Sequence, residues 1–373
     1  MTATPTVEIC CKVPLTDRII LATQEDVSYP PQRWRLTNGD MASVEVEVAA
    51  DKIRHDYATY SVKGKDNYFV NSRVEHLRVM LSMVNVSTDD FDRLNGKHPT
   101  ADVHRAHLVS RTTGEGVDID YQDAEVFGKR VYQEIREAVN HVLEIIRDVY
   151  GQHWLKLLVD EQSTQNFLDE VRATYRFSPS AEWKHLLVTP NVASFGPVGV
   201  GGAKRFLEIS DWIAMQTAVD SGTRPNLVLT LLSEANERFD RGDKQLAIIH
   251  LSSALEWAVT TYLEAQLASR IPKKPLDQIL DQSHGRLLED WVWPLNGEVG
   301  TGITQPEWQA VKGVQKLRQK AGHIFLSPEI ESLADRDFQV LLVNSAAFIQ
   351  RVTGVQQLKR PFPMLGISRV TTG

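Results

Sequence analysis

Cysteine is nearly absent from this 373-residue chain, which contains only Cys10 and Cys11. Two adjacent cysteines exclude a framework of disulfide bonds, because such a framework needs several pairs at separated positions. Neighbouring side chains on a strand point to opposite faces, so the pair does not favour a shared metal site. We therefore expect a fold without structural disulfides. We also expect no cofactor.

The chain also lacks an excess of positive charge and any long apolar segment. Its formal net charge is −7, with 41 Lys and Arg residues against 48 Asp and Glu residues. This balance excludes a generally basic coat for nucleic acid and leaves only a local basic patch open. The N-terminus has no basic region followed by an apolar core, and no apolar run reaches the length of a bilayer span. We therefore expect a cytoplasmic protein with no membrane partner.

What the chain does contain is enough length for two domains and enough apolar residues, 42% of the total, for ordinary cores. A turn-rich stretch, Ser221–Pro225, separates a first part with strand patterns from a second part with helical patterns only. We predict an α+β protein. Residues 1–222 form an N-terminal mixed α/β region, residues 223–355 form an all-α helical domain, and residues 356–373 form an extended tail.

Strand patterns dominate the N-terminal region. The clearest is Val44–Val48, in which apolar and charged residues alternate strictly, as on a half-buried strand. Helical patterns are fewer, and the longest runs from Asp123 to about Leu158. The further expected strands are 18–22, 57–62, 107–110 and 183–192, and the further expected helices are 73–83 and 164–175.

Two places in the N-terminal region have the composition of a ligand site. His104 and His107 lie close in sequence, but on a strand they face opposite ways, so we expect no metal there. The glycine-rich stretch Phe195–Arg205 lacks the Gly-Lys-Ser/Thr ending of a nucleotide-binding P-loop. We expect a mobile loop or hairpin, with Lys204 and Arg205 as candidate contacts to phosphate groups.

Helical patterns fill the second part of the chain. The expected helices are 226–239, 243–269, 275–293, 305–322 and 329–352, separated by glycine and proline residues. The fourth has the clearest start, because Thr304 and Glu307 have capping-box spacing and Pro306 lies in the first turn. Its apolar side chains form one stripe, which consists of Trp308, Val311, Val314, Leu317 and Ala321.

An arginine and a histidine stand out in this fourth helix. Arg318 falls inside the apolar stripe, where a guanidinium must extend to water, pair with an acid or lie at a subunit interface. His323 follows near the helix end, which Gly322 and Pro328 indicate. A helix C-terminus favours the charged form of a histidine, and the plain interpretation is that Arg318 extends to water and His323 caps the helix.

A second misplaced charge lies in the helix expected at 243–269. Glu256 falls within the broad apolar arc of that helix, beside Leu255 and Val259. One interpretation is a boundary residue whose carboxylate reaches solvent. The other is an ion pair with Arg318, because a buried charge needs a partner of opposite sign. The occurrence of two misplaced charges of opposite sign favours the ion pair.

The residues around Arg318 resemble the signature of the HEPN family, a group of small helical domains that includes many metal-independent ribonucleases. That signature is an arginine and a histidine near the end of a core helix, with four to six residues between them. Leu317–His323 fits it, except that Gln319 stands where the family commonly has a smaller polar residue such as asparagine. Leu246–Glu256 also resembles an early core helix of the family. The resemblance covers residues 225–353, about a third of the chain.

The resemblance implies an endoribonuclease with an all-α HEPN-like bundle and no metal ion. RNA carries its own nucleophile, the 2′-hydroxyl, and histidine suits the proton transfers because its pKa lies near neutrality. Arginine suits the phosphate because its planar guanidinium donates two hydrogen bonds and stays charged. Arg318 and His323 are the expected catalytic residues, and the products are a 2′,3′-cyclic phosphate and a 5′-hydroxyl. Glu256 and Gln319 are expected to support them, and the expected RNA contacts are Lys316, Lys320, Lys204 and Arg205.

The resemblance also implies partners and a biological role. HEPN ribonucleases generally act as dimers in which two copies of the site meet, so we expect an isologous homodimer through the helical domain. A role as a bacterial toxin or anti-phage defence effector follows from the family. Residues 1–222 are then a sensor, an inhibitor or an RNA-positioning module, which receives a regulatory protein or ligand.

Two alternatives remain open. One is a non-catalytic HEPN-like scaffold that dimerises or binds nucleotide. The other is a ligand-binding protein whose function lies wholly in residues 1–220. The basic residues Lys316 and Lys320 beside the motif favour the ribonuclease, because a scaffold has no need of them.

Overall fold

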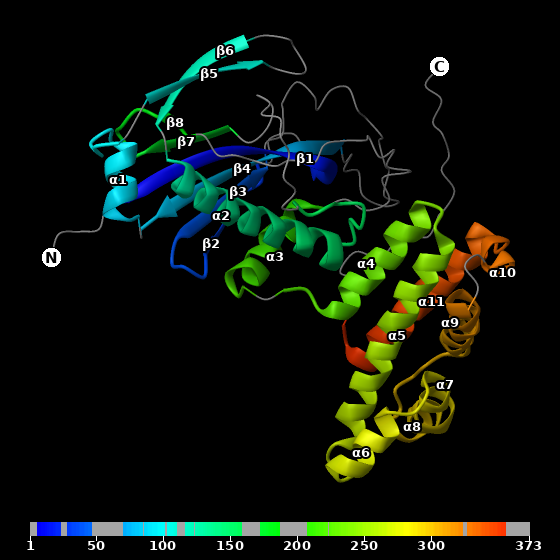
Figure 1. The fold of residues 1–373 in the computed structure, drawn as a ribbon. Helices are drawn as coiled ribbons and strands as arrows, with labels where there is room; N and C mark the ends of the chain where they lie inside the picture. The colour runs from blue at the N-terminus through cyan, green and yellow to red at the C-terminus, as the bar shows by residue number, and fades with distance from the viewer. Residues whose placement is uncertain are drawn as a thin grey trace, which may run out of the picture. The chain divides into compact units, whose positions relative to one another are not determined.

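A computed structural model gives the fold, and the chain divides into two compact units. The N-terminal unit comprises residues 1–145 and 155–224, and the C-terminal unit comprises residues 146–154 and 225–373. Figure 1 shows a sheet in the first unit and helices in the second, which confirms the expected α+β class. The structure describes residues 6–23, 28–46, 70–84, 86–100, 103–109, 116–122, 124–158, 172–186, 207–222, 224–323 and 327–355.

The N-terminal unit is built on a sheet. Its described strands are β1 (Val7–Thr23), β2 (Gln32–Arg35), β3 (Met41–Val46), β4 (Val70–Met83), β5 (Val103–Val109), β6 (Gly116–Gln122), β7 (Arg172–Arg176) and β8 (Lys184–Leu186). They lie in the order β2-β3-β4-β1-β7-β8-β6-β5. Neighbouring strands are antiparallel, apart from the parallel pairing of β6 with β8. The long strands β1 and β4 pair along most of their length, with a register shift between Pro14 and Ile19.

The alternation of side chains along β1 explains why this segment is a strand. Val7, Ile9, Cys11 and Val13 are fully buried, whereas Cys10 between them is only partly buried. Side chains on a strand alternate between two faces, so one face of β1 packs into the core. The adjacent cysteines therefore point to opposite faces, as the sequence predicts.

Several other strand predictions are confirmed where the structure describes them. Residues 44–46 lie in β3, 18–22 in β1, 107–109 in β5 and 184–186 in β8. The predicted strand at 57–62 and the glycine-rich stretch 195–205 lie outside the described residues.

Two predicted helices of this unit are wrong. The segment predicted as a helix at 73–83 lies in β4, where Leu77, Val79 and Leu81 are buried at a spacing of two residues. Residues 172–175, predicted as the end of a second helix, belong to β7, and the rest of that prediction lies outside the described residues. Both segments pair with β1, so pairing with a neighbouring strand prevailed over local preference.

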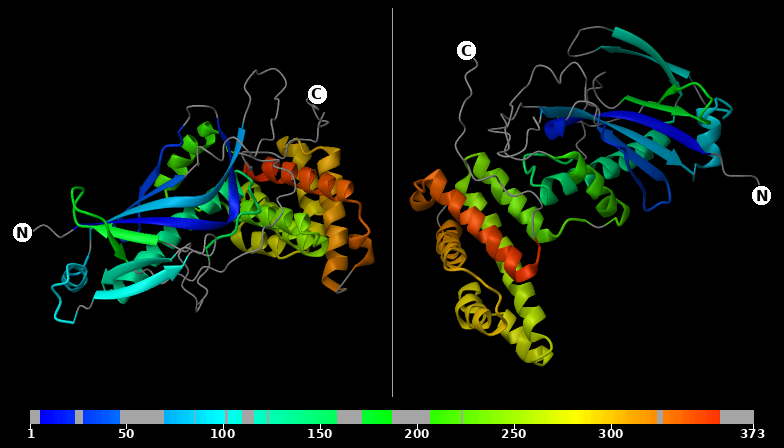
Figure 2. Two further views of the ribbon diagram at one scale, coloured as in Figure 1. Left: turned by 90° about the horizontal axis from the view of Figure 1, so that it is seen from above. Right: turned by 180° about the vertical axis from the view of Figure 1, so that it is seen from behind.

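Helices pack beside the sheet. They are α1 (Thr88–Leu94), α2 (Glu125–Glu144) and α3 (Ile209–Asp220), and α2 is followed directly by the π-helix η2 (Ile145–Val149). α2 contacts β3 and β4, α3 contacts β1 and β2, and Figure 2 shows both helices lying along the sheet. The helical pattern predicted from residue 123 to about 158 thus ends near residue 149, and α3 is a helix that the sequence did not indicate.

The described part of the C-terminal unit consists of helices and their connections. They are α4 (Leu227–Asp240), α5 (Lys244–Leu267), α6 (Lys273–Leu280), α7 (His284–Arg286), the π-helix η3 (Leu287–Val292), α8 (Trp293–Val299), α9 (Gln305–His323), α10 (Pro328–Glu331) and α11 (Asp335–Thr353). The predicted helices at 226–239, 243–269 and 305–322 are confirmed as α4, α5 and α9. The segment predicted as one helix at 275–293 is divided instead, because Ser283 starts a new helical turn after α6 ends.

α5 is the central helix of the C-terminal unit, and it packs against α4, α9 and α11. Of the described helices, α5 alone is long and apolar enough to cross a membrane by length and composition. However, 56% of its most apolar window is buried within the structure. A helix that is apolar around most of its circumference is typical of a protein core, and the position of α5 accounts for its composition.

Candidate functional site

α9 carries the arginine–histidine motif, and a reciprocal cap fixes its start. The Thr304 backbone N–H donates to Glu307 Oε2 at 2.8 Å, and the Glu307 N–H donates to Thr304 Oγ1 at 3.5 Å. Glu307 is 4% exposed and accepts hydrogen bonds from Arg351 Nε of α11 on both carboxylate oxygens at 2.8 Å. This geometry confirms the predicted capping box and ties the start of α9 to the end of α11.

Arg318 lies beside the buried stripe of α9. Val311, Val314 and Ala321 of that stripe are buried, whereas Arg318 is half-buried. Arg318 has no hydrogen-bond or ion-pair partner among the described residues. α9 continues to His323, whose side chain lies outside what the structure describes. The helix therefore presents a partly desolvated guanidinium whose donors are not used by any described side chain.

Glu256 does not form the ion pair with Arg318 that the sequence favours. Its side chain is exposed on α5 and accepts a hydrogen bond from Ser252 Oγ at 3.2 Å, and no ion pair joins it to Arg318 among the described residues. Leu255 and Val259 are buried on the same helix, so Glu256 occupies the outer edge of the apolar arc. The boundary interpretation is therefore correct. The sequence could not decide between the two interpretations, because the apolar arc of α5 is too wide to show which of its edges faces a neighbouring helix.

The basic residues around the motif differ in how far they are already paired. Lys320 forms an ion pair with Glu329 of α10, whereas Lys316 and Gln319 are exposed and have no such partner within the described structure. Lys204 and Arg205 lie outside the described residues. Of the expected phosphate contacts that the structure describes, Lys316 and Arg318 therefore have no ion-pair partner among the described residues.

α7 contacts α9 one turn before Arg318 and contains a histidine, His284, that lies outside the arginine–histidine motif. An ideal Cβ at Gly285 would lie 2.2 Å from Gln315 Nε2, so the α7 backbone packs directly against the Gln315 amide. Nδ1 of the neighbouring His284 is buried and has no partner among the described residues. Burial lowers the pKa of His284 below its usual 6.5, and the Glu256 carboxylate partly opposes this shift. The predicted helix at 275–293 runs through this histidine, so the sequence did not indicate that a helix starts here.

The chain segment after α9 is anchored to α5 by Gln245. Its Nε2 donates to the Ala321 carbonyl at 3.1 Å, and its Oε1 accepts the Ser327 backbone N–H at 3.4 Å. The two anchored residues lie on either side of His323 in the sequence. Spacing along the chain gives no sign of this contact, because Gln245 and Ala321 are 76 residues apart.

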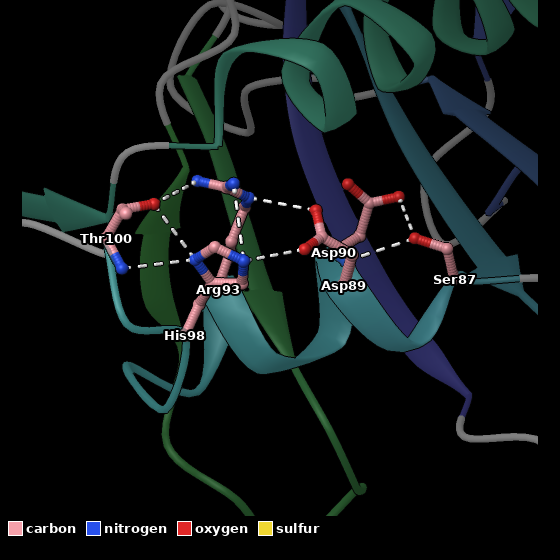
Figure 3. A network of polar contacts seen from close by, with 6 residues as sticks. All are labelled: Ser87, Asp89, Asp90, Arg93, His98 and Thr100. Atoms are coloured by element: carbon pink, nitrogen blue, oxygen red, sulfur yellow. Dashed lines mark hydrogen bonds and ion pairs between the residues drawn. The ribbon is translucent and has the colours of Figure 1, made fainter.

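A second polar network surrounds α1 (Figure 3). His98 Nε2 lies 2.7 Å from Asp89 Oδ1, and His98 Nδ1 lies 3.0 Å from Thr100 Oγ1. Arg93 Nε donates to Asp89 at 3.0 Å, and Ser87 caps the helix start. This order of carboxylate, imidazole and hydroxyl resembles a nucleophile relay, but His98 Nδ1 also accepts the Thr100 backbone N–H at 3.2 Å, and Asp89 is 59% exposed. We interpret the network as the closure of the loop that follows α1.

Two buried carboxyl groups share one partly exposed arginine elsewhere in the N-terminal unit. Arg130 Nη2 donates to Asp40 Oδ2 at 2.8 Å and Arg130 Nε donates to Glu134 Oε1 at 2.9 Å. Asn38 Nδ2 donates to the same two oxygens at 3.0 and 2.8 Å. Glu134 Oε2 is buried without a partner among the described residues. Burial raises the pKa of Glu134 to about 7, while the hydrogen bond from Arg130 opposes this shift and the Asp40 carboxylate adds to it.

The described residues contain no group of three or more His, Cys, Asp or Glu side chains placed to hold a metal ion. His104 and His107 both lie on β5, as the strand interpretation of that segment requires. No family model, no curated protein and no solved structure matches the chain. The candidate site therefore rests on its own geometry and on the resemblance of its motif.

Proposed function

We propose that the C-terminal unit is a metal-independent endoribonuclease of the HEPN type, with Arg318 and His323 as its catalytic residues. The observation that carries the proposal is the state of Arg318, which is half-buried on α9 and has no carboxylate partner among the described residues. A partly desolvated charge gains more from an anion than an exposed one does. The phosphodiester of RNA is such an anion, and a guanidinium can bind two of its oxygens at once.

The reaction assigned to the site is transesterification at phosphorus. A base removes the proton from the 2′-hydroxyl, the 2′-oxygen attacks the adjacent phosphorus, and the bond to the 5′-oxygen breaks. An acid protonates that leaving oxygen, which gives a 2′,3′-cyclic phosphate and a 5′-hydroxyl. Arg318 stabilises the charge on the phosphoryl oxygens, and His323 transfers a proton.

A homodimer belongs to this proposal. One chain supplies one copy of His323, whereas the reaction uses both a base and an acid, and an isologous dimer brings two copies together. α11 offers support, because Val340 and Val343 lie about one turn apart and are 51 and 52% exposed. Light scattering measures the molar mass, and a strictly monomeric protein with full activity contradicts the dimer.

The biological role in this proposal is a toxin or anti-phage effector. A ribonuclease that acts on cellular RNA must be restrained until it is needed, and the N-terminal unit is the part of the chain available for restraint or for positioning RNA. The resemblance of the motif supports this role. A regulatory protein or ligand would then act through the N-terminal unit.

A direct test incubates the purified protein with mixed RNAs in EDTA, beside His323→Ala and Gln309→Ala. Gln309 is exposed on the same helix as the motif and serves as the matched control. We expect the wild type and Gln309→Ala to cleave RNA and to leave cyclic phosphate ends. His323→Ala should be slower by about 100-fold or more, because general acid–base catalysis contributes that much. Wild-type cleavage by His323→Ala would show that the site is misassigned.

A non-catalytic scaffold that dimerises or binds nucleotide is the second candidate, and one observation favours it. Two lysines of α9 already have acidic partners, since Lys312 lies 2.8 Å from Glu289 and Lys320 pairs with Glu329. The positive surface offered to RNA is therefore smaller than the sequence indicates. Titration with a nucleoside triphosphate, together with RNA that stays intact, would support the scaffold.

A further inference from the structure

One side chain holds the chain on both sides of His323. Gln245 lies in the first turn of α5, donates through Nε2 to the Ala321 carbonyl at 3.1 Å, and accepts the Ser327 N–H on Oε1 at 3.4 Å. The two contacts belong to the two ends of one planar amide. A single group therefore binds the backbone at Ala321 and again at Ser327, on the two sides of the histidine in the sequence.

The two backbone groups that Gln245 binds have a physical need for a partner. The Ala321 carbonyl lies in the last turn of α9, where no backbone N–H of the helix is available to donate to the carbonyl oxygens. Ser327 precedes α10 as its N-cap residue and is 1% exposed, so its N–H is shielded from water. Buried backbone groups are nearly always hydrogen-bonded, and the Gln245 amide satisfies a donor and an acceptor together.

The residue next to Gln245 holds the following connection in the same way. Lys244 Nζ donates to the Leu333 carbonyl at 2.7 Å and lies 2.9 Å from Asp335 Oδ1, at the start of α11. The first turn of α5 thus fixes the chain between α9 and α11 at two successive places.

We propose that Gln245 is a positioning residue for His323. By binding the backbone before and after the histidine, Gln245 restricts the positions open to the backbone that carries the catalytic group, and in this respect the inference rests on the proposed ribonuclease function. Arg318 lies about one turn before Ala321 within α9, so loosening the segment beyond Ala321 affects the histidine more than the arginine. The requirement is specific to an amide, because glutamate keeps the shape but loses the donor.

The test compares Gln245→Glu with Gln309→Glu, which introduces the same charge at an exposed position of α9. Rates are measured on a short RNA in EDTA. We expect kcat of Gln245→Glu to fall by about 10- to 100-fold, as for a displaced catalytic group. We expect KM to change by less than about threefold, because phosphate binding by Arg318 persists. Gln245→Met, which removes both hydrogen bonds without adding charge, should show the same loss of kcat.

Hydrogen exchange provides a second readout that does not depend on activity. The backbone amides between Ala321 and Ser327 should exchange faster in Gln245→Met than in Gln309→Glu. Faster exchange together with a lower kcat supports the inference. Wild-type kcat in both Gln245 variants overturns it and leaves the ribonuclease standing. A wild-type protein that cleaves no RNA overturns the proposed function itself, and the positioning role with it.

Discussion

The two units place a partly withdrawn arginine in opposite situations. In the N-terminal unit, Arg130 is 31% exposed and binds Asp40 and Glu134 at 2.8 and 2.9 Å. In the C-terminal unit, Arg318 is half-buried and has no partner among the described residues. The first arginine neutralises charge within the fold, whereas the second retains its hydrogen-bond donors. The contrast supports a structural role for Arg130 and a ligand-binding role for Arg318.

The N-terminal cluster is nevertheless one positive charge short. Asp40 is 0% and Glu134 7% exposed at the side chain, and Arg130 supplies one positive charge for the two carboxyl groups. The mismatch is relieved by a proton, because burial raises the pKa of Glu134 to about 7. The Asp40–Arg130–Glu134 cluster therefore takes up a proton, whereas Arg318 in the C-terminal unit is proposed to bind a phosphate.

Removing Arg130 should have the largest effect on stability. Arg130→Met leaves Asp40 and Glu134 buried without a cation, and we expect a loss of about 3 kcal/mol in the free energy of unfolding at pH 7. Arg105→Met is the matched control, because its ion pair with Asp120 is 71 and 57% exposed and should contribute less than about 1 kcal/mol. Urea unfolding measures both, and equal losses would contradict the structural role of Arg130.

Replacing Glu134 should change how stability depends on pH. The native pKa of about 7 lies above the usual 4.5, so the folded state holds the proton more tightly than the unfolded state does. The stabilisation by this proton is fully present below pH 4.5 and is lost as pH rises through 7. We expect Glu134→Gln to gain on the order of 2–3 kcal/mol relative to wild type between pH 5 and pH 8. Parallel stability curves for the two proteins would contradict the shared proton.

Because residues 146–154 belong to the C-terminal unit, we expect a fragment that begins at Pro225 to have a lower free energy of unfolding. Such a fragment lacks residues 146–154, whose Asp148 accepts a hydrogen bond from Thr230 at 2.8 Å and whose Arg147 carbonyl accepts one from Ser233 at 3.1 Å. At about 1 kcal/mol for each hydrogen bond, the fragment should be less stable by about 2 kcal/mol than one with residues 146–154 fused to it. Equal melting temperatures would show that residues 146–154 are dispensable. Greater toxicity of the fused fragment than of the full chain would support restraint by the N-terminal unit.

The smallest effect is expected at Glu256. Its carboxylate is exposed and bonded to Ser252, so Glu256→Gln should change the free energy of unfolding by less than about 0.5 kcal/mol. Thermal unfolding of this variant is measured beside that of Arg130→Met. A loss as large as that of Arg130→Met would show that Glu256 pairs with Arg318 after all.

Local sequence signals predicted local structure well. The spacing of Thr304 and Glu307 predicted a capping box whose hydrogen bonds the structure shows, because a cap involves groups only a few residues apart. The alternation at residues 44–46 predicted β3 for a similar reason, since the period of two appears within a few residues. Both predictions needed no knowledge of distant segments.

Features that depend on distant contacts were missed. The helix predicted at 73–83 is β4 because it pairs with β1, which lies far away in the sequence. The ion pair that the sequence favoured between Glu256 and Arg318 is absent from the described residues, because only packing shows which edge of α5 faces a neighbour. Gln245 could not be recognised, because its contacts with Ala321 and Ser327 span 76 and 82 residues. The sequence shows the arginine–histidine motif, but it does not show which residue of α5 contacts the backbone beside that motif.

We propose that Arg318 has no partner among the described residues because its partner is an RNA phosphate. The most direct measurement determines thermal stability and RNA cleavage in one variant, Arg318→Met, beside Arg130→Met. We predict that Arg318→Met melts within about 2 °C of wild type, because no described side chain loses a partner, and that it cleaves RNA at least about 100-fold more slowly. An Arg318→Met protein that is destabilised as strongly as Arg130→Met but cleaves RNA at the wild-type rate would contradict the claim.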